Sequence, residues 1–153
     1  MTTLEYIGIS LVTGLTGTTI MTLFVLAIHR ASRYQLNVIR ILGTMLTGST
    51  GPNGECAANA AAYVTGTIVH YLVGFFFAFI YVFLWNNEMI SRDWITTGVI
   101  GFITGLVGIA VWRLYFFVYR QPPAVELRWY LPCILFAHVV FAWGAQWAYQ
   151  LDL

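Results

Sequence analysis

The sequence predicts an all-α protein, a polytopic membrane bundle of four helices, and three observations support this fold class. Hydrophobic residues make up 59% of the 153 residues and charged residues 8%, with a mean hydropathy of +0.78. A chain of this composition has too little polar surface to cover a water-soluble globule. Four segments reach the length of about 20 apolar residues that a bilayer-spanning helix needs. They lack the alternating pattern of a membrane barrel, so helices are predicted.

The four predicted spans account for most of a single membrane domain, residues 1–153. They run from Tyr6 to Ile28, from Tyr63 to Trp85, from Trp94 to Val118 and from Trp129 to Leu151. The first segment lacks the basic region and the small-residue cleavage site of a signal peptide, and it is longer than the apolar part of one. We therefore expect it to remain in the mature protein as the first transmembrane helix.

A short amphipathic helix is predicted at about residues 34–47, between the first two spans. The stretch YQLNVIRILGTML places Asn37, Arg40 and Thr44 on one helical stripe and apolar side chains on the other side. This pattern is typical of a helix that lies in the membrane interface. The segment is either a connector that packs on the end of the bundle or a docking surface for a partner, and both interpretations fit the pattern.

Two pairs of similar segments indicate that the chain is built from two parallel helical-hairpin repeats, residues 1–86 and 94–153. TGLTGTTIMTLF in the first span aligns with TGLVGIAVWRLY in the third, and VHYLVGFFFAFIY in the second aligns with AHVVFAWGAQWAY in the fourth. The second alignment pairs His70 with His138. Parallel repeats of this kind occur in membrane carriers. Closely spaced glycines in the first and third spans predict tight helix packing.

Arginine predicts the orientation in the membrane, because the chain contains no lysine. Six arginines lie in or near the first and third connections, whereas only Arg92 lies in the second; the six are Arg30, Arg33, Arg40, Arg113, Arg120 and Arg128. The positive-inside rule then places these two connections in the cytoplasm and both termini outside. The formal net charge of +1 argues against a nucleic-acid partner. Cys56 and Cys133 fall on the reducing side and are interpreted as ordinary thiols.

The two paired histidines are the candidate site. His70 and His138 are each predicted about two turns inside the cytoplasmic start of a span, and therefore at the same depth. One interpretation is a neutral imidazole hydrogen-bonded to a threonine or tyrosine inside the bundle. The other is a haem b site, with both imidazoles as axial ligands of the iron. Met21 and Thr22 are predicted to line the same pocket.

Arg113 is the third candidate residue of this haem site. It lies about a turn or more inside the cytoplasmic end of the third span, where its guanidinium could meet a haem propionate. The alternative is that the long side chain extends along the helix to the lipid headgroups. Both interpretations stay open at this point.

Three classes of function are compatible with these features. The leading hypothesis is a non-catalytic accessory or structural subunit of a larger membrane complex, of the respiratory or photosynthetic kind, with the lipid bilayer and other membrane subunits as partners. The second is a haem-binding electron-transfer subunit with His70 and His138 as ligands. The third is a small-solute transporter, which ranks lower because no predicted span contains an embedded carboxylate. We expect no catalytic activity of its own, since no nucleophile, base and oxyanion elements converge.

Several stretches resemble a known family. VTGLTGTTIMTLF, LNVIRILGTMLTG, IVHYLVGFFFAFIY and LFAHVVFAWGAQWAY are similar to segments of small four-helix bacterial integral membrane proteins of a family of unknown function. The resemblance covers most of the chain and includes the histidines of the second and fourth spans. It implies a four-helix fold and a place in the bacterial inner membrane. The third span departs from the family, because VWRLYFFVYRQPP replaces a more aliphatic, methionine-rich end.

Overall fold

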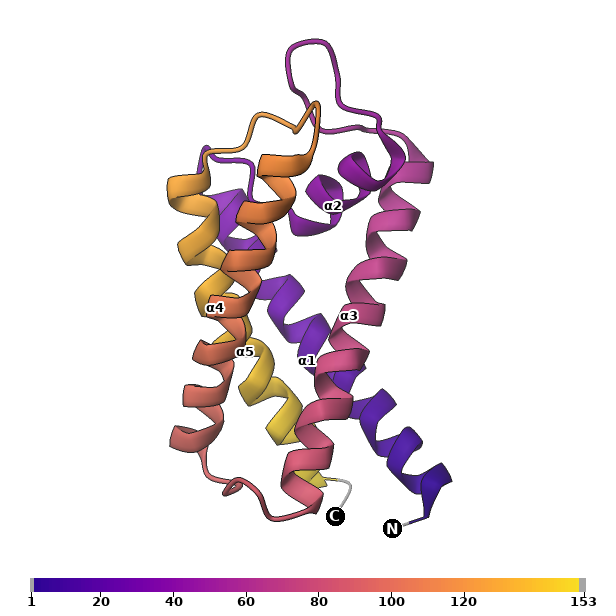
Figure 1. Ribbon diagram of the computed structural model, residues 1–153, viewed down its shortest axis with the longest axis vertical. Helices are drawn as coiled ribbons and strands as arrows, with labels where there is room; N and C mark the ends of the chain where they lie inside the picture. The colour runs from indigo at the N-terminus through magenta and orange to yellow at the C-terminus, as the bar shows by residue number, and fades with distance from the viewer. Residues whose placement is uncertain (1, 152–153) are drawn as a thin grey trace.

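The computed structural model describes residues 2–151, and within this range it contains five helices and no strand (Figure 1). Their bounds are α1 Thr3–Ala31, α2 Val38–Thr47, α3 Ala60–Asn86, α4 Trp94–Val118 and α5 Leu127–Leu151. The helices other than α2 are each long and apolar enough to cross a membrane. The predicted all-α fold with four membrane-length helices is thereby confirmed. Residues 1 and 152–153 of the predicted domain lie outside the described residues.

The long helices α1, α3 and α4 begin where a side chain accepts hydrogen bonds from the first free amides. Thr2 and Glu5 form a reciprocal capping box at the start of α1. The Asn59 side chain accepts from the amide of Ala62, so α3 begins three residues before its predicted start. Asp93 accepts from the amides of Ile95 and Thr96, and α4 has its predicted bounds. Hydropathy alone does not mark these caps, because they lie outside the apolar segments.

The four long helices form an open arrangement. α1 packs on α3 and on α5, and α5 packs on α4. In Figure 1, α3 and α4 stand on either side of a gap, with α1 and α5 behind it and α2 across its upper end. The hydroxyls of Tyr81 and Thr104, 2.8 Å apart, join α3 to α4. If the two hairpins were related by symmetry, α4 would pack on α3 in the way that α1 packs on α5. The helix contacts described above do not include such packing of α4 on α3. The repeat architecture therefore stays a prediction.

Glycines let the packed helices approach to backbone contact. A Cβ atom at Gly17 of α1 would lie 2.9 Å from the carbonyl oxygen of Phe141 in α5. A Cβ atom at Gly105 of α4 would lie 2.9 Å from the carbonyl oxygen of Leu135 in α5. Both distances are too short for a real side chain, so these positions require glycine. Gly17 and Gly105 therefore serve the close packing predicted for the first and third spans.

The helix α2 packs tightly against the start of α3. A Cβ atom at Gly43 would overlap the carbonyl of Ala62, so the two helix backbones are in direct contact. Ile41 and Met45 are fully buried beneath it. The Arg40 guanidinium donates to the carbonyls of Cys56 and Ala57, and the hydroxyl of Thr44 accepts from the amide of Ala57. The polar stripe of α2 thus holds the connector that leads into α3.

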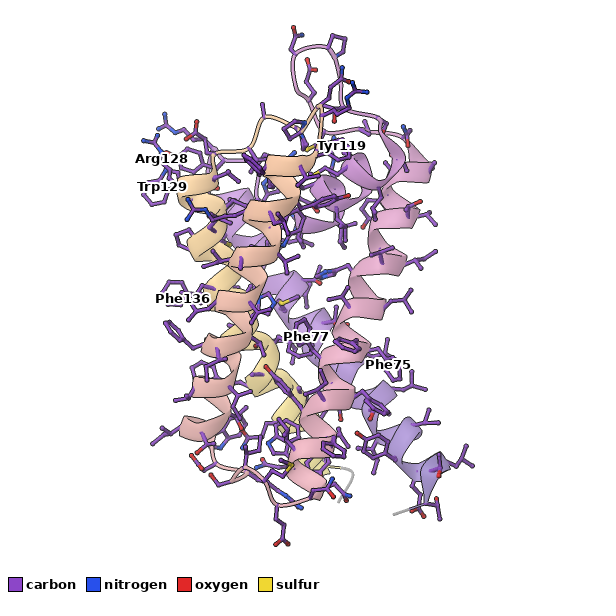
Figure 2. The ribbon with its side chains drawn as sticks, viewed as in Figure 1. Phe75, Phe77, Tyr119, Arg128, Trp129 and Phe136 are labelled. Carbon is purple, nitrogen blue, oxygen red and sulfur yellow. The ribbon has the colours of Figure 1, made fainter. Side chains whose placement is uncertain are left out.

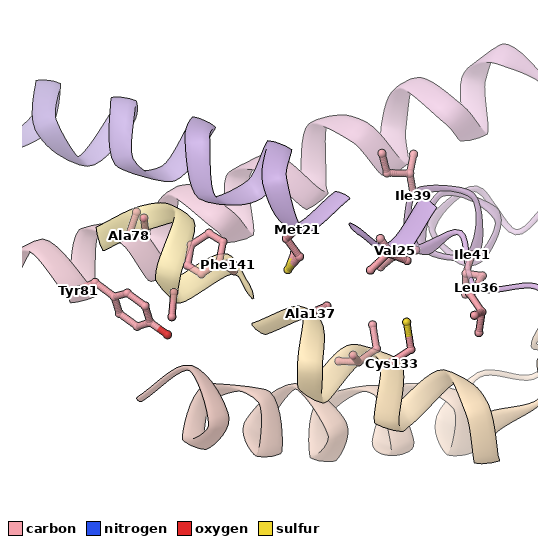
Figure 3. Close-up of a cluster of buried hydrophobic side chains, with 14 of the residues drawn as sticks. Met21, Val25, Leu36, Ile39, Ile41, Ala78, Tyr81, Cys133, Ala137 and Phe141 are labelled. Atoms are coloured by element: carbon pink, nitrogen blue, oxygen red, sulfur yellow. The ribbon is translucent and has the colours of Figure 1, made fainter. Parts of the chain in front are cut away.

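A continuous apolar core runs along α1 and α5. Figure 3 shows Met21 and Val25 of α1 facing Ala137 and Cys133 of α5. Large apolar side chains also cover the outside of the bundle, including Phe136 (60% exposed), which Figure 2 shows pointing away from it. Exposing so many apolar groups to water is unfavourable, whereas contact with the acyl chains of a bilayer is favourable for them.

Candidate ligand site between α3 and α4

A cavity of about 410 Å³ lies in the gap between α3 and α4, on the side of α2; we call it the α3–α4 cavity. Met21 of α1 and Phe141 of α5 contribute to its floor, and Val38 and Leu42 of α2 close its upper end. Phe77 projects from α3 into the gap (Figure 2). The volume lies in the range of small-molecule sites, roughly 300–1,000 Å³. The size and the enclosure on four sides fit a ligand rather than a packing defect.

The mouth of the cavity opens outward between α3 and α4. Val73 of α3 and Val107 of α4 both line it and remain 46% and 50% exposed. In a membrane this opening faces the acyl chains, so a ligand would enter from the bilayer. Among the lining residues that the structure describes, only His70, His138, Trp112 and Tyr115 carry polar nitrogen or oxygen atoms on their side chains. None of them is a carboxylate, and the cavity is otherwise apolar.

His70 is held by a short chain of hydrogen bonds to α1. Its ring is 6% exposed, and Nε2 lies 3.0 Å from Oγ1 of Thr22. The Thr22 hydroxyl donates its single hydrogen to the carbonyl oxygen of Thr18, 2.7 Å away. With its hydrogen on the Thr18 carbonyl, the hydroxyl accepts from His70, and we therefore assign the hydrogen to Nε2 and the lone pair to Nδ1 of a neutral ring.

In His138 the other ring nitrogen, Nδ1, carries the hydrogen. Its Nδ1 atom lies 2.8 Å from the carbonyl oxygen of Ile134, which can only accept, so Nδ1 carries the hydrogen and Nε2 carries the lone pair. The edge of the ring lies against Gly108 of α4, where a Cβ atom would stand 2.8 Å from Cε1. Phe77 packs perpendicular to the ring at 5.9 Å between centroids. A glycine and an aromatic ring thus fix the imidazole plane.

The structure brings some of the predicted site residues together and leaves one apart. His70 and His138 line the same cavity, Met21 lines it as well, and Thr22 binds His70. The two histidines are the eleventh residue of α3 and the twelfth of α5, about 15 Å along each helix. Arg113 is exposed on α4 and is not among the lining residues. The helical positions of Trp112 and Tyr115, not that of Arg113, face the cavity.

The donor set can be compared with what a two-histidine haem would require. Each axial imidazole must offer a lone pair, and the other ring N–H is commonly held by a carbonyl or carboxylate. His138 has this form, with Nδ1–H on the Ile134 carbonyl and Nε2 free. His70 does not, because its Nε2–H is already donated to Thr22. With this assignment, ligation of a haem iron by both Nε2 atoms would require the His70 hydrogen to move to Nδ1, and the haem site stays a prediction.

A second polar region lies at the opposite end of the bundle and was not singled out by the sequence analysis. The amide of Gln146 donates to the carbonyl of Arg92 at 2.8 Å, and the Arg92 guanidinium donates to the carbonyl of Trp85 at 3.1 Å. The guanidinium carbon also lies 5.3 Å from the ring centre of Tyr149. Several enclosed polar atoms nearby have no partner, and these residues do not line the α3–α4 cavity. The candidate site is the α3–α4 cavity, because it combines a volume of ligand size with the two predicted histidines.

Asp93 and Cys56 are among the groups outside the spans whose pKa is shifted from its ordinary value. The Ser91 hydroxyl and the Thr96 amide hold the pKa of the Asp93 carboxyl well below its usual range. Burial raises the pKa of the Cys56 thiol, which lies in the connector before α3. Cys56 is thus expected to remain a protonated, unreactive thiol.

Comparison with known proteins adds no functional information. No protein-family model matches the chain, and neither a curated protein nor a solved structure does. The α3–α4 cavity and its polar groups are therefore the features that indicate a function.

Proposed function

We propose that this protein binds a small, mainly apolar molecule that enters the α3–α4 cavity from the membrane. One observation carries the proposal. His70 of α3 and His138 of α5, both well inside membrane-length helices, line the same cavity. Ionisable side chains inside a membrane are costly, and they usually mark a functional site. An apolar cavity with a few convergent polar groups is also the common form of a small-molecule site.

A purely structural role for the two histidines leaves part of the arrangement unexplained. One hydrogen bond to Thr22 and one to Ile134 would anchor each ring. A leucine or phenylalanine at either position would fill the space without bringing a polar ring into the membrane. Each ring also has a second nitrogen without a hydrogen bond to the described chain, on a side chain that lines the cavity. A ligand that pairs with these nitrogens accounts for both residues.

The charge distribution supports an orientation for this site. Arg33 and Arg128 lie at the α2 end of the bundle, together with most of the other arginines. The connection between α3 and α4 at the other end contains Glu88 and Asp93 as well as Arg92. By the positive-inside rule we place the α2 end in the cytoplasm and both termini outside, in a bacterial inner membrane. The cavity would then open in the cytoplasmic half of the bilayer.

The proposal is compatible with a role as an accessory subunit of a larger membrane complex. Exposed aromatic side chains such as Phe117 (87% exposed) and Trp147 are available on the outer surface for contacts with other helices. A partner subunit would appear as a protein that co-purifies in a fixed ratio. The same preparation tests the haem hypothesis, because bound haem b gives a visible absorption band that apoprotein lacks.

A blocked-mouth variant tests the proposed function. In Val107→Trp, an indole replaces a valine that lines the cavity at its mouth; Val99→Trp makes the same change at an exposed position of α4 that does not line it. The probe is a dimethoxynaphthalene, and its binding is measured in lipid nanodiscs against empty nanodiscs. We expect saturable binding by wild type and Val99→Trp, and its loss in Val107→Trp. Equal binding by all three proteins, or no saturable binding of either this probe or the corresponding naphthalenediol, would overturn the proposal.

A further inference from the structure

We propose that the ligand of the α3–α4 cavity is a hydrogen-bond donor, an apolar ring compound with hydroxyl groups of the hydroquinone or phenol type. This inference rests on the proposed function and specifies the chemistry of its ligand. Its basis is the hydrogen-bond pattern of the two histidines, which makes both of them acceptors toward the cavity. A quinone or ketone, whose oxygens only accept, would pair with neither ring.

The hydrogen bonds between α1 and His70 make Nδ1 of His70 the first acceptor. The Thr18 carbonyl takes the hydrogen of the Thr22 hydroxyl, and the hydroxyl in turn takes the hydrogen on Nε2 of His70. In the reversed assignment the Thr22 hydroxyl would donate to Nε2 and give up its hydrogen bond to the Thr18 carbonyl, so the chain as assigned makes one more hydrogen bond. Nδ1 therefore keeps its lone pair, and it is not among the fully enclosed polar atoms that lack a partner. Its accessible surface lies on a ring that lines the cavity.

The hydrogen bond of His138 to the backbone of α5 makes Nε2 of His138 the second acceptor. The Ile134 carbonyl can only accept, so the hydrogen of a neutral His138 stays on Nδ1. A second hydrogen would make the ring a cation, and no lining residue described for this cavity is an acid that could balance its charge. Nε2 thus carries a lone pair as well. It forms no hydrogen bond with the described chain and, like Nδ1 of His70, is not fully enclosed.

The other polar groups of the cavity favour a hydroxyl over a carbonyl or an ether. Trp112 and Tyr115 line the part of the cavity toward α2 and can donate from Nε1 and from the phenol. A ligand hydroxyl can donate to an imidazole nitrogen and also accept from such a donor. An ether or carbonyl oxygen can only accept, so binding it leaves both histidine nitrogens unpaired in an apolar site. Unpaired acceptors in a site of this kind are the basis of strong discrimination between ligands.

A matched pair of probes separates this inference from the proposed function. One probe is a naphthalenediol with a hydroxyl on each ring, and the other is its dimethyl ether, which keeps the shape and removes both donors. We expect wild-type protein in nanodiscs to bind the diol about tenfold more tightly, as the recovery of one or two hydrogen bonds implies. Equal affinities, with both probes excluded by Val107→Trp, would overturn the inference and retain the site. No saturable binding of either probe would overturn the proposed function.

Two variants test whether the histidines cause the preference for the diol. In Thr22→Val the acceptor for His70 is gone and its hydrogen can move to Nδ1, so the preference should decrease; His138→Phe removes the other acceptor and should decrease it too. Thr16→Val, a change on α1 at a residue outside the cavity, should leave it unchanged. If Thr22→Val and His138→Phe both keep the wild-type preference for the diol over its dimethyl ether, the inference is overturned.

A measurement on the wild-type protein does not depend on the folding of any variant. Side-chain ¹⁵N NMR shifts distinguish a protonated from an unprotonated ring nitrogen in neutral histidine. We expect protonation of His70 at Nε2 and of His138 at Nδ1. Protonation of His70 at Nδ1, or of His138 at Nε2, would overturn the inference directly.

Discussion

The hydroxyl of Thr22 sets the hydrogen position on His70 across the contact between α1 and α3. Oγ1 lies 3.0 Å from Nε2 of the histidine and 2.7 Å from the carbonyl oxygen of Thr18, to which it donates. One hydroxyl therefore links the helix backbone of α1 to the ring that lines the α3–α4 cavity. Both the stability of the bundle and the chemistry of the cavity depend on this residue.

Replacing Thr22 with valine should destabilise the protein. Valine has nearly the same shape but cannot accept from Nε2 of His70, so a buried N–H loses its partner. We expect the free energy of unfolding to decrease by about 1–3 kcal/mol. Unfolding by a denaturing detergent in mixed micelles measures the change. Thr16→Val is the control and should stay within about 0.5 kcal/mol of wild type; equal effects of the two variants would show that the Thr22 hydrogen bond contributes nothing.

Replacing Gly17 with alanine should disrupt the packing of α1 on α5. The new Cβ atom would lie 2.9 Å from the carbonyl oxygen of Phe141, and a backbone atom cannot move aside as a flexible side chain can. We expect a loss of about 1–3 kcal/mol in the free energy of unfolding. Gly8→Ala is the matched control, because a Cβ atom added at Gly8 would have no neighbouring atom within 4 Å. A neutral Gly17→Ala would contradict the packing described here.

Replacing Gly108 with alanine should change ligand binding more than stability. The added Cβ atom would stand 2.8 Å from Cε1 of His138, at the edge of a side chain that can rotate. The ring would then turn, and Nε2 would leave its position at the cavity. We expect binding of the naphthalenediol to weaken about tenfold, while binding of the dimethyl ether changes less. If both probes weaken equally, His138 acts through the shape of the cavity and not through its nitrogen.

Removing the hydroxyl of Tyr81 should loosen the closure between α3 and α4. This hydroxyl lies 2.8 Å from that of Thr104 and joins the two helices next to the cavity. In Tyr81→Phe we expect a loss of about 0.5–1.5 kcal/mol in stability and faster release of the bound probe, measured by stopped-flow displacement. The control is Tyr63→Phe, at a tyrosine of α3 that is 54% exposed. Unchanged release in Tyr81→Phe would show that the hydrogen bond does not control the opening.

The cap of α4 should make stability depend on pH. Hydrogen bonds from the Ser91 hydroxyl and the Thr96 amide lower the pKa of Asp93 in the folded protein from 3.8, its ordinary value. A lowered carboxyl pKa stabilises the folded state fully above the unfolded value, and this contribution is lost as the pH falls toward the folded value. Thermal unfolding followed from neutral into acidic pH should show the loss in wild type. Asp93→Asn should flatten this part of the profile; an unchanged profile would contradict the role of the cap.

The sequence predicted the helices well, because long apolar segments leave the backbone no alternative inside a membrane. The span Trp94–Val118 has its predicted bounds, whereas α1 and α3 begin at the polar caps Thr2 and Asn59, which hydropathy does not detect. Similar segments also paired His70 with His138, and both line one cavity.

The cavity itself could not be predicted from the sequence. It exists because α1 and α5 pack together while α3 and α4 remain apart, and this order of packing depends on backbone contacts such as that of Gly17 with Phe141. The side of α4 that faces the gap also depends on this order. The orientation of α4 that results leaves Arg113 exposed and places Trp112 in the lining of the cavity. The hydrogen positions on the two histidines depend on carbonyls and hydroxyls that only the three-dimensional arrangement identifies.

The most direct test of the ligand site is side-chain ¹⁵N NMR of histidine-labelled protein in nanodiscs, titrated with the naphthalenediol. The chain has three histidines, and His29 lies at the end of α1, outside the cavity, as an internal reference. We expect the signals of Nδ1 of His70 and Nε2 of His138 to shift saturably while those of His29 stay constant. If the diol leaves both cavity histidines unshifted, or shifts all three alike, the α3–α4 cavity is not the binding site proposed here.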